Sequence, residues 1–178
     1  MPNPFQTRDE SLMNRLFLAI PVHLYDYPKF RHDFDPFLEG RWREEETLHI
    51  TIAFLGKRFD AADVIEKVDA FAWSFDPSPL RGWDYFTKSR VFVATTHNPS
   101  LQTLYDRLSP LLELESTLLK PHVTLMRVKG FKDSEAFFRR LKEPSLDALG
   151  YLKPQVILYR SILHPHGAEY QPLQEWHL

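Results

Sequence analysis

Two stretches of the chain alternate polar and apolar residues in the same order. Residues 48–56 (LHITIAFLG) and residues 120–127 (KPHVTLMR) each hold a histidine, an apolar β-branched residue, a threonine and then an apolar run. Successive residues of a β-strand point to opposite faces. We therefore expect His49 and Thr51 on one face of a strand. The opposite face of this strand is expected to carry apolar residues: Ile50, Ile52 and Phe54.

The second stretch repeats this arrangement. His122 and Thr124 are expected on one face, and Val123 and Leu125 on the other. A single His-x-Thr triplet on a strand is most often structural, with the histidine packed and the hydroxyl bonded to a neighbour. Two copies of the form His-[Ile/Val]-Thr-[Ile/Leu] are much harder to explain by chance. The repeat therefore predicts one site built from two similar halves.

The rest of the pattern predicts a mixture of strands and helices. Short apolar or alternating runs bounded by turn residues predict strands at 15–20 (closed by Pro21), 80–87, 90–95, 155–163 and 168–177. Apolar residues at helical spacing predict helices over about 61–74 with Asp60 as N-cap, after Asn98-Pro99 as far as a kink or stop at Pro110, and after Asp133 or Ser134. Residues 23–43 mix aromatic and charged residues around two prolines, so we expect them to be irregular apart from one or two helical turns.

We predict the α+β class, with two pseudo-symmetric, mostly antiparallel sheets flanked by helices around a central cleft. No stretch has the composition of a linker, so residues 15–178 are expected to form a single bilobal domain. Residues 1–14 lack the apolar centre of a secretory signal and are expected to be a mobile leader.

Composition narrows the classes of function. The net charge is −2, which excludes a polyanion binder that relies on bulk charge and leaves a local basic site open. There is no cysteine, which excludes disulfides and thiolate chemistry. No apolar run approaches a membrane span, and a cytoplasmic location follows by default. We expect a monomer.

The two histidines are 73 positions apart, so they can meet only through the fold. If the polar faces of both strands border one cleft, the pair suits in-line displacement at phosphorus. One neutral imidazole takes a proton from water, and the other, protonated, delivers a proton to the leaving oxygen. The hydroxyls of Thr51 and Thr124 donate hydrogen bonds to the non-bridging oxygens, whose charge grows in the transition state. This mechanism needs no metal and no other cofactor.

At this separation, the paired motifs resemble the signatures of the 2H phosphoesterase superfamily, specifically its LigT-like branch of RNA 2′,3′-cyclic phosphodiesterases. Residues 15–20 (RLFLAI) resemble the opening strand of the family, and residues 170–178 resemble its ending. The resemblance implies a bilobal fold with a pseudo-two-fold axis and the hydrolysis of a terminal 2′,3′-cyclic phosphate to a 2′-phosphomonoester. It also implies that His49 protonates the leaving 3′-oxygen and His122 activates water, although near-symmetry permits the reverse.

Two further residues are candidates for substrate binding. Arg127 matches an arginine that the family places near the bound nucleotide, where it would contact a phosphate or stack on a base. Strict alternation puts Arg127 on the face opposite His122, so it reaches the cleft only through a bulge, strand twist or its own length. Phe17, on the first expected strand, either stacks on a base or packs in the core.

Other interpretations stay open. The same histidines suit reversible 2′–5′ RNA ligation, and a cleft that had lost turnover would leave a nucleotide- or RNA-binding module. His164 and His166 flank a proline and lack a third metal ligand at typical spacing, so they fit surface turn residues better. The expected partner is RNA or a nucleotide with a 2′,3′-cyclic phosphate end. The basic residues expected at the cleft rim are Lys57, Arg58, Lys88, Arg90, Lys120 and Lys129.

Overall fold

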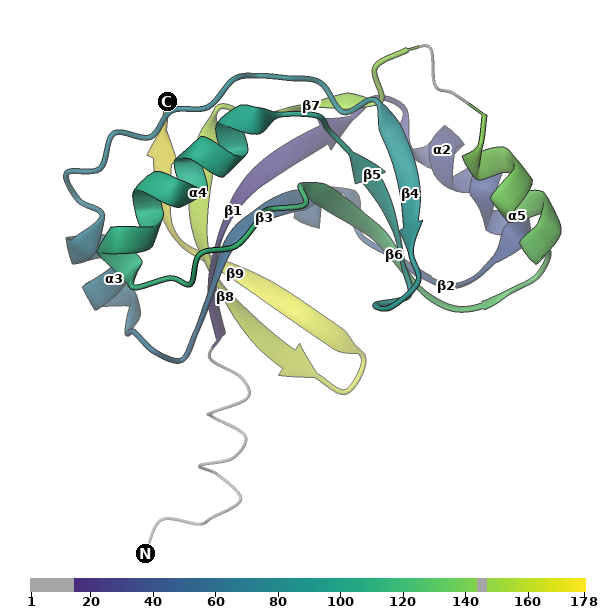
Figure 1. Cartoon of the computed structure of the whole chain (residues 1–178). Coiled ribbons are helices and arrows are strands. Elements are labelled where there is room, and N and C mark those ends of the chain that lie inside the picture. Colours follow the sequence, from purple (N-terminus) through teal and green to yellow (C-terminus); the bar gives the residue numbers. More distant parts are fainter. Residues whose placement is uncertain (1–14, 144–146) are drawn as a thin grey trace, which may run out of the picture.

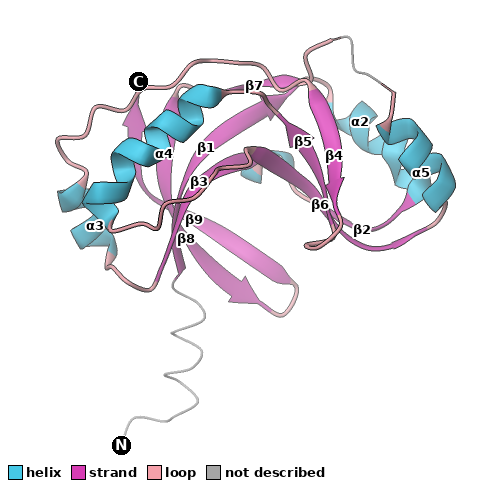
Figure 2. Ribbon diagram, viewed as in Figure 1, coloured by secondary structure: helices cyan, strands magenta, loops and turns pink. Residues whose placement is uncertain are grey.

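The computed structural model describes residues 15–143 and 147–178. Within these ranges the chain forms nine β-strands and four α-helices (Figures 1 and 2). The strands are β1 (Arg15–Leu24), β2 (Leu38–Trp42), β3 (His49–Gly56), β4 (Gly82–Phe86), β5 (Val91–Thr95), β6 (His122–Phe131), β7 (Gly150–Leu152), β8 (Gln155–His164) and β9 (Gly167–His177). The helices are α2 (Tyr27–Phe34), α3 (Ala61–Lys67), α4 (Pro99–Leu112) and α5 (Ser134–Leu141). The leader expected at residues 1–14 lies outside the described residues.

The strands pair antiparallel in the order β4-β5-β6-β3-β1-β8-β9, with β2 added beside β6 and β7 beside β1. The predicted α+β class with mostly antiparallel strands is confirmed. The two halves meet where β3 pairs with β6 at Ile50 and Val123, so they form one continuous sheet and not the two separate sheets expected. Helices α3 and α4 lie at one end of this sheet and α2 and α5 at the other (Figure 1).

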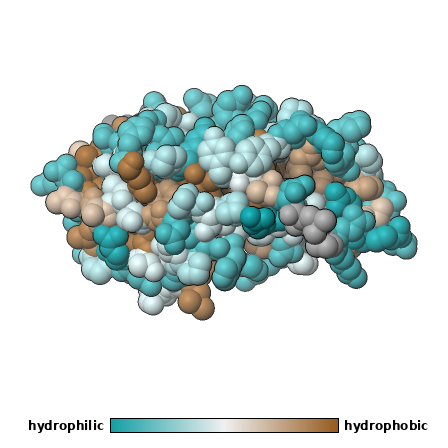
Figure 3. Space-filling model, turned by 90° about the horizontal axis from the view of Figure 1, so that it is seen from above, coloured by the Kyte–Doolittle hydropathy of each residue, from teal (hydrophilic) through white to brown (hydrophobic). Residues whose placement is uncertain are grey.

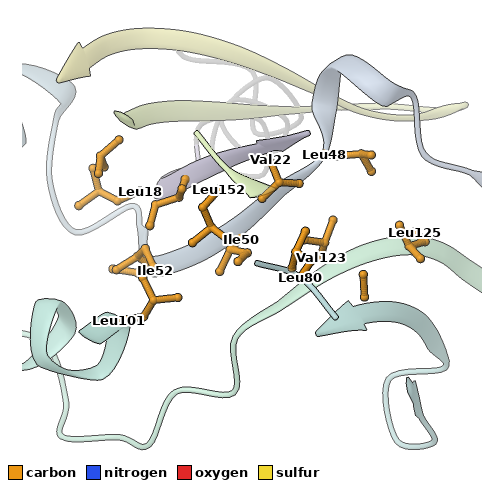
Figure 4. Packing of buried hydrophobic residues seen from close by; sticks show 14 of the residues in the cluster. Leu18, Val22, Leu48, Ile50, Ile52, Leu80, Leu101, Val123, Leu125 and Leu152 are labelled. Atoms are coloured by element: carbon orange, nitrogen blue, oxygen red, sulfur yellow. The ribbon is translucent and has the colours of Figure 1, made fainter. Parts of the chain in front are cut away.

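The apolar faces of the two central strands continue into one core. Ile50 and Ile52 of β3 and Val123 and Leu125 of β6 are each at most 2% exposed. Figure 4 shows their side chains beside those of other buried leucines and valines. Seen from above, the outer surface is mostly hydrophilic, with apolar side chains scattered over it (Figure 3). In the described ranges, no helix combines the length and the apolar character needed to cross a membrane.

Residues 23–43 are more regular than expected, and the prediction of a largely irregular segment is wrong. They contain the end of β1, all of α2 and all of β2. Pro28 sits in the first turn of α2, where a missing N–H leaves no helical bond unmade. The ring of Phe34 is buried against Trp83 and Phe92. The aromatic residues of this segment therefore supply the apolar face of a helix.

The sequence predicted that the first strand ends at Pro21, but β1 continues past this residue. β1 pairs with β8 through Ala19 and with β7 from Val22 onward. Pro21 lies at this change of partner, where its lack of an N–H interrupts neither ladder on that side. The strand therefore continues for three residues beyond the proline.

The helix predicted over residues 61–74 is shorter in the structure, where α3 spans Ala61–Lys67. α3 ends at Lys67 because the chain turns there and packs its next aromatic residues against other elements. The guanidinium of Arg107 on α4 lies 4.6 Å from the ring of Phe71, and Trp73 packs against Trp176 of β9. The expected second helix begins at Pro99 and runs past Pro110 to Leu112.

Candidate active site

The pair formed by Ile50 and Val123 fixes both His-x-Thr motifs on one face of the sheet. These two apolar side chains point into the core. The residues on either side of each must point the other way, because strand side chains alternate. In an antiparallel register this also puts each histidine across from the threonine of the other motif. The four polar side chains line one cavity: His49, Thr51, His122 and Thr124.

Both imidazoles are held by the same backbone contact. Nδ1 of His49 lies 2.7 Å from the carbonyl oxygen of Thr47, and Nδ1 of His122 lies 2.6 Å from that of Lys120. A carbonyl oxygen only accepts hydrogen bonds, so Nδ1 donates in each ring. In the neutral ring Nε2 is then the proton acceptor. Each histidine thus has one fixed nitrogen and one nitrogen left for proton exchange.

The two threonine hydroxyls remain available to a ligand. Thr51 and Thr124 are half-buried and line the cavity. Within the described part of the chain, neither hydroxyl is hydrogen-bonded to another protein group. A hydroxyl can donate to a non-bridging phosphate oxygen while accepting from water. The cavity therefore holds two imidazoles and two free hydroxyl donors.

His49 is surrounded by aromatic rings. Phe17 of β1 and Tyr170 of β9 each place a ring centroid 5.3 Å from the imidazole, and Tyr159 of β8 places one at 6.1 Å. Phe17 is itself only 4% exposed, and its ring also stacks on Tyr159. The structure therefore places Phe17 mainly in packing against His49, with one side on the cavity.

This setting changes the acidity of the imidazole. Burial lowers the pKa of His49, because the charged form loses hydration. The nearby charges of Arg43 and His122 lower it further, whereas the bond to Thr47 acts in the opposite direction. An effect of His122 on His49 also requires the two rings to lie within electrostatic range of each other. Before a substrate binds, His49 therefore favours its neutral form.

His122 has different neighbours. Its ring meets the edge of Phe86 at a centroid distance of 4.9 Å. The ammonium group of Lys120 lies 4.3 Å from the centre of the same phenyl ring, a cation–π geometry. His49 thus lies among several aromatic rings, whereas His122 lies beside one ring that also carries a cation.

Each of the two central strands has a bulge at the equivalent position, and the bulge changes the face to which later side chains point. In its pairing with β1, β3 gains an extra residue between Thr51 and Ala53. In its pairing with β5, β6 gains one between Thr124 and Met126. A bulge puts two residues opposite one and reverses the alternation beyond it. From each histidine onward, the seven residues accordingly follow the same order of exposure: half-buried, buried, half-buried, buried, buried, exposed, buried.

The bulges bring one residue of each strand to the cleft. Phe54 is 78% exposed and lines the cavity, so the prediction that it shares the apolar face of Ile50 is wrong. Arg127 is exposed and lines the same cavity, so the bulge resolves the conflict between alternation and its expected place near the site. The two residues follow His49 and His122 by the same five positions.

The cavity suits an anionic ligand. Its volume is about 1010 Å³, at the upper end of the range for small-molecule sites. Its lining includes five cationic residues: Arg15, Arg43, Lys57, Lys120 and Arg127. Among the described residues that line it, none is an aspartate or a glutamate. This local excess of positive charge contrasts with the overall charge of −2.

Sequence reasoning missed four residues around the cavity. Phe54 depends on a bulge, and Phe86 of β4 is brought beside His122 by the pairing of β4 with β5 and of β5 with β6. Arg43 and Tyr170 come from the segment after β2 and from the last strand. The signal that could have found Phe54 is its spacing from His49, which equals that of Arg127 from His122.

The expected rim cations divide into two groups. Those that line a cavity are Lys57, Lys120 and Lys129. Arg58 instead donates to the carbonyl oxygens of Leu112 and Glu113 at the end of α4, and Arg90 donates to the carbonyl of Lys129. Lys88 lines neither cavity. Local hydrogen bonds therefore account for Arg58 and Arg90.

The two histidines of the last turn lie side by side on the β8–β9 hairpin. The rings of His164 and His166 are nearly parallel, 5.2 Å apart, and Nε2 of His164 lies 2.8 Å from a carboxylate oxygen of Glu169. Across residues 15–143 and 147–178, no group of three or more His, Cys, Asp or Glu side chains is placed to hold a metal ion.

Comparison with known proteins shows similarity to one group of phosphoesterases. The family model described as LigT like Phosphoesterase matches residues 29–93, which include the first His-x-Thr motif. A curated RNA 2′,3′-cyclic phosphodiesterase of Methanocaldococcus jannaschii is 28% identical over 176 residues, covering 91% of this chain and 99% of that protein. The chain is similar to the LigT-like phosphoesterases.

Solved structures are similar to this chain in fold. The protein TT0787 of Thermus thermophilus matches with a TM-score of 0.72 and 27% identity, over 92% of this chain and 97% of its own. Escherichia coli LigT, in its complex with NADP+, matches with a TM-score of 0.70 and 24% identity, over 93% of this chain and 98% of its own. The LigT-like fold therefore extends across both halves of the chain, including the second motif that lies beyond the family-model match.

Proposed function

We propose that this LigT-like protein hydrolyses the 2′,3′-cyclic phosphate of an RNA end or a nucleotide to a 2′-phosphomonoester, without a metal. One observation carries the proposal. The two His-x-Thr motifs converge on one cationic cavity, each with Nδ1 of its histidine held by a backbone carbonyl. The M. jannaschii relative is named as an enzyme for this reaction, which supports the same substrate class here.

In this proposal, water attacks the phosphorus in line with the leaving 3′-oxygen. A bond forms between the water oxygen and phosphorus, and the bond from phosphorus to the 3′-oxygen breaks. The water proton passes to Nε2 of one histidine, and Nε2 of the other protonates the 3′-oxygen. Each proton transfer contributes about 10²–10⁴ in rate. The hydroxyls of Thr51 and Thr124 donate to the non-bridging oxygens, where negative charge accumulates.

The roles implied by the family resemblance are His49 as acid and His122 as base. The lowered pKa of His49 opposes the acid role in the free protein, because that role needs the protonated ring. An anionic phosphodiester within about 4–6 Å favours protonation and acts against the burial. We therefore propose that substrate binding charges His49 and prepares it to donate.

We further propose that Phe54 and Arg127 hold the nucleotide that carries the cyclic phosphate. Both are exposed, line the cavity and occupy matching places in its two halves. A phenyl ring and a planar guanidinium both stack on bases, and a guanidinium also binds phosphate. Phe17 also lines the cavity, and we propose that its ring acts by packing against His49.

The proposal predicts both the reaction and the product. Purified protein is incubated with each of the four 2′,3′-cyclic nucleotides in EDTA, and the position of the phosphate is identified by phosphorus NMR. The expected product is the 2′-phosphate. A 3′-phosphate product, or loss of activity in EDTA, contradicts the proposal. Adding an RNA with a free 5′-hydroxyl to the same reaction separates hydrolysis from 2′–5′ ligation.

We also propose that residues 15–178 act as one bilobal, monomeric domain. Both histidines come from adjacent strands of one chain, so the cavity needs no second copy. Light scattering after gel filtration tests the monomer, and a second copy required for activity contradicts it. A cytoplasmic location stays a prediction.

A further inference from the structure

A second cavity adjoins the proposed active site. It has a volume of about 770 Å³ and shares Arg43, Thr47, Arg127, Leu163 and Tyr170 with the first. Its cationic lining residues are Arg41, Arg43, Arg127 and Lys129, and its carboxylates are Glu44 and Glu169. Four positive and two negative charges leave an excess of +2 with the histidines neutral. The cavity is therefore a basic extension of the cleft in an acidic protein.

Two neighbouring strands present these cations in a row. Arg41 of β2 and Arg127 of β6 are directly paired, so their side chains leave the sheet on the same face. Val128 is buried while Lys129 is exposed and lines the second cavity. Arg43, one residue beyond the end of β2, lines both cavities and lies close enough to lower the pKa of His49. The positive charge thus runs continuously from the active site outward.

The tip of the β8–β9 hairpin forms the opposite wall. Nη1 of Arg41 donates to the carbonyl oxygen of His166 and so ties the hairpin to β2. A guanidinium has five N–H donors, so this bond leaves most of them for a ligand. On the same wall, a carboxylate oxygen of Glu169 already accepts a hydrogen bond from Nε2 of His164. The groove is therefore tied together at one point, and its guanidinium donors are open to an anion.

We propose that this second groove binds the phosphate and ribose of the nucleotide that precedes the cyclic end, so that the preferred substrate is an RNA chain. The inference rests on the proposed function of the first cavity and names its substrate class. The first cavity already has the volume of a small-molecule site. A second cavity with its own cations has no role for a mononucleotide. It does fit the next backbone phosphate of a chain, which Arg and Lys bind without reading sequence.

The test compares chain lengths. The value of kcat/KM is measured for 2′,3′-cyclic AMP and for a trinucleotide of adenosine that ends in a 2′,3′-cyclic phosphate. We expect the trinucleotide to be favoured at least tenfold by the wild type. The double variant Arg41→Ala/Lys129→Ala should lower this ratio about tenfold, since it removes two charged contacts. The matched control Lys29→Ala/Lys142→Ala removes the same charge from exposed residues of α2 and the end of α5 and should keep the wild-type ratio.

A ratio near one in the wild type, or an unchanged ratio in the double variant, overturns the inference and leaves the proposed function standing. If neither substrate is hydrolysed, the proposed function fails. The inference about the second groove is then tested by RNA binding alone. The affinity of a fluorescent adenosine hexanucleotide with a 3′-phosphate is then measured against salt. The slope should fall by about one for each cation removed, and an unchanged slope overturns the inference. The double variant also removes the bond from Arg41 to His166, which could disturb the hairpin. Lys129→Ala alone keeps this bond, so its effect on the slope comes from the lost charge.

Discussion

Phe54 and Arg127 occupy matching positions in the two halves of the cleft, each five residues after a histidine and each beyond a bulge. Both bulges turn to the cavity a side chain that strict alternation would have sent to the core. The halves therefore match in backbone but differ in chemistry, with a phenyl ring on one side and a guanidinium on the other. This difference gives the near-symmetric cleft two distinct walls.

Replacing Phe54 with Ala should weaken substrate binding and leave the fold intact. The side chain is 78% exposed, so the free energy of unfolding should change by no more than about 0.5 kcal/mol. Loss of stacking on a base costs about 1–3 kcal/mol, which predicts a rise in KM of about tenfold for a cyclic nucleotide. Steady-state kinetics and urea unfolding measure the two effects.

Ile52→Ala is the matched control on the same strand. Ile52 is 2% exposed, and its truncation should lower the free energy of unfolding by about 2–5 kcal/mol. If Phe54→Ala destabilises the protein as much as Ile52→Ala does, Phe54 is a packing residue and its assignment to the nucleotide is wrong.

Removing either cavity hydroxyl should slow the chemical step. Thr51→Val and Thr124→Val keep the side-chain shape but delete a donor to the phosphate oxygens. Loss of one such donor reduces kcat by about 10²-fold, with a smaller change in KM because charge on the oxygens grows in the transition state. Thr103→Val changes an exposed threonine of α4 in the same way and should behave as wild type. An equal fall in the control variant would refute the role of the hydroxyls.

The lowered pKa of His49 gives a directional pH test of the two roles. In His122→Ala, the remaining activity depends on His49 alone. If His49 is the acid, only its protonated form works, so kcat/KM falls as pH rises through a pKa below the ordinary value of 6.5. We expect this descending profile between about pH 5 and pH 8. A kcat/KM that rises with pH in His122→Ala means that His49 acts as the base, with the roles exchanged.

The regular alternation around His49 and His122 was enough to predict the two central strands and their polar face. Phe54 escaped because a bulge is set by how β3 pairs with β1 and cannot be seen in one strand alone. Tyr170 escaped for a related reason, since only the sheet order brings β9 into the cavity. Local pattern specifies the elements, whereas the site also depends on their register.

Residues 23–43 show a second limit of local pattern. Their aromatic residues follow no clear period, because they pack against β4, β5 and α5 from a short helix. The basic second groove also could not be predicted from local pattern. Arg41 and Arg127 are 86 positions apart in the sequence and become neighbours only when β2 pairs with β6.

The most direct test of the central claim is the turnover of 2′,3′-cyclic AMP, in EDTA, by the wild type and by His49→Ala and His122→Ala. Circular dichroism first establishes that both variants keep the fold. Each variant should lose at least about 10²-fold in kcat, the lower range of one acid–base contribution. Near-full activity in both folded variants would contradict the account.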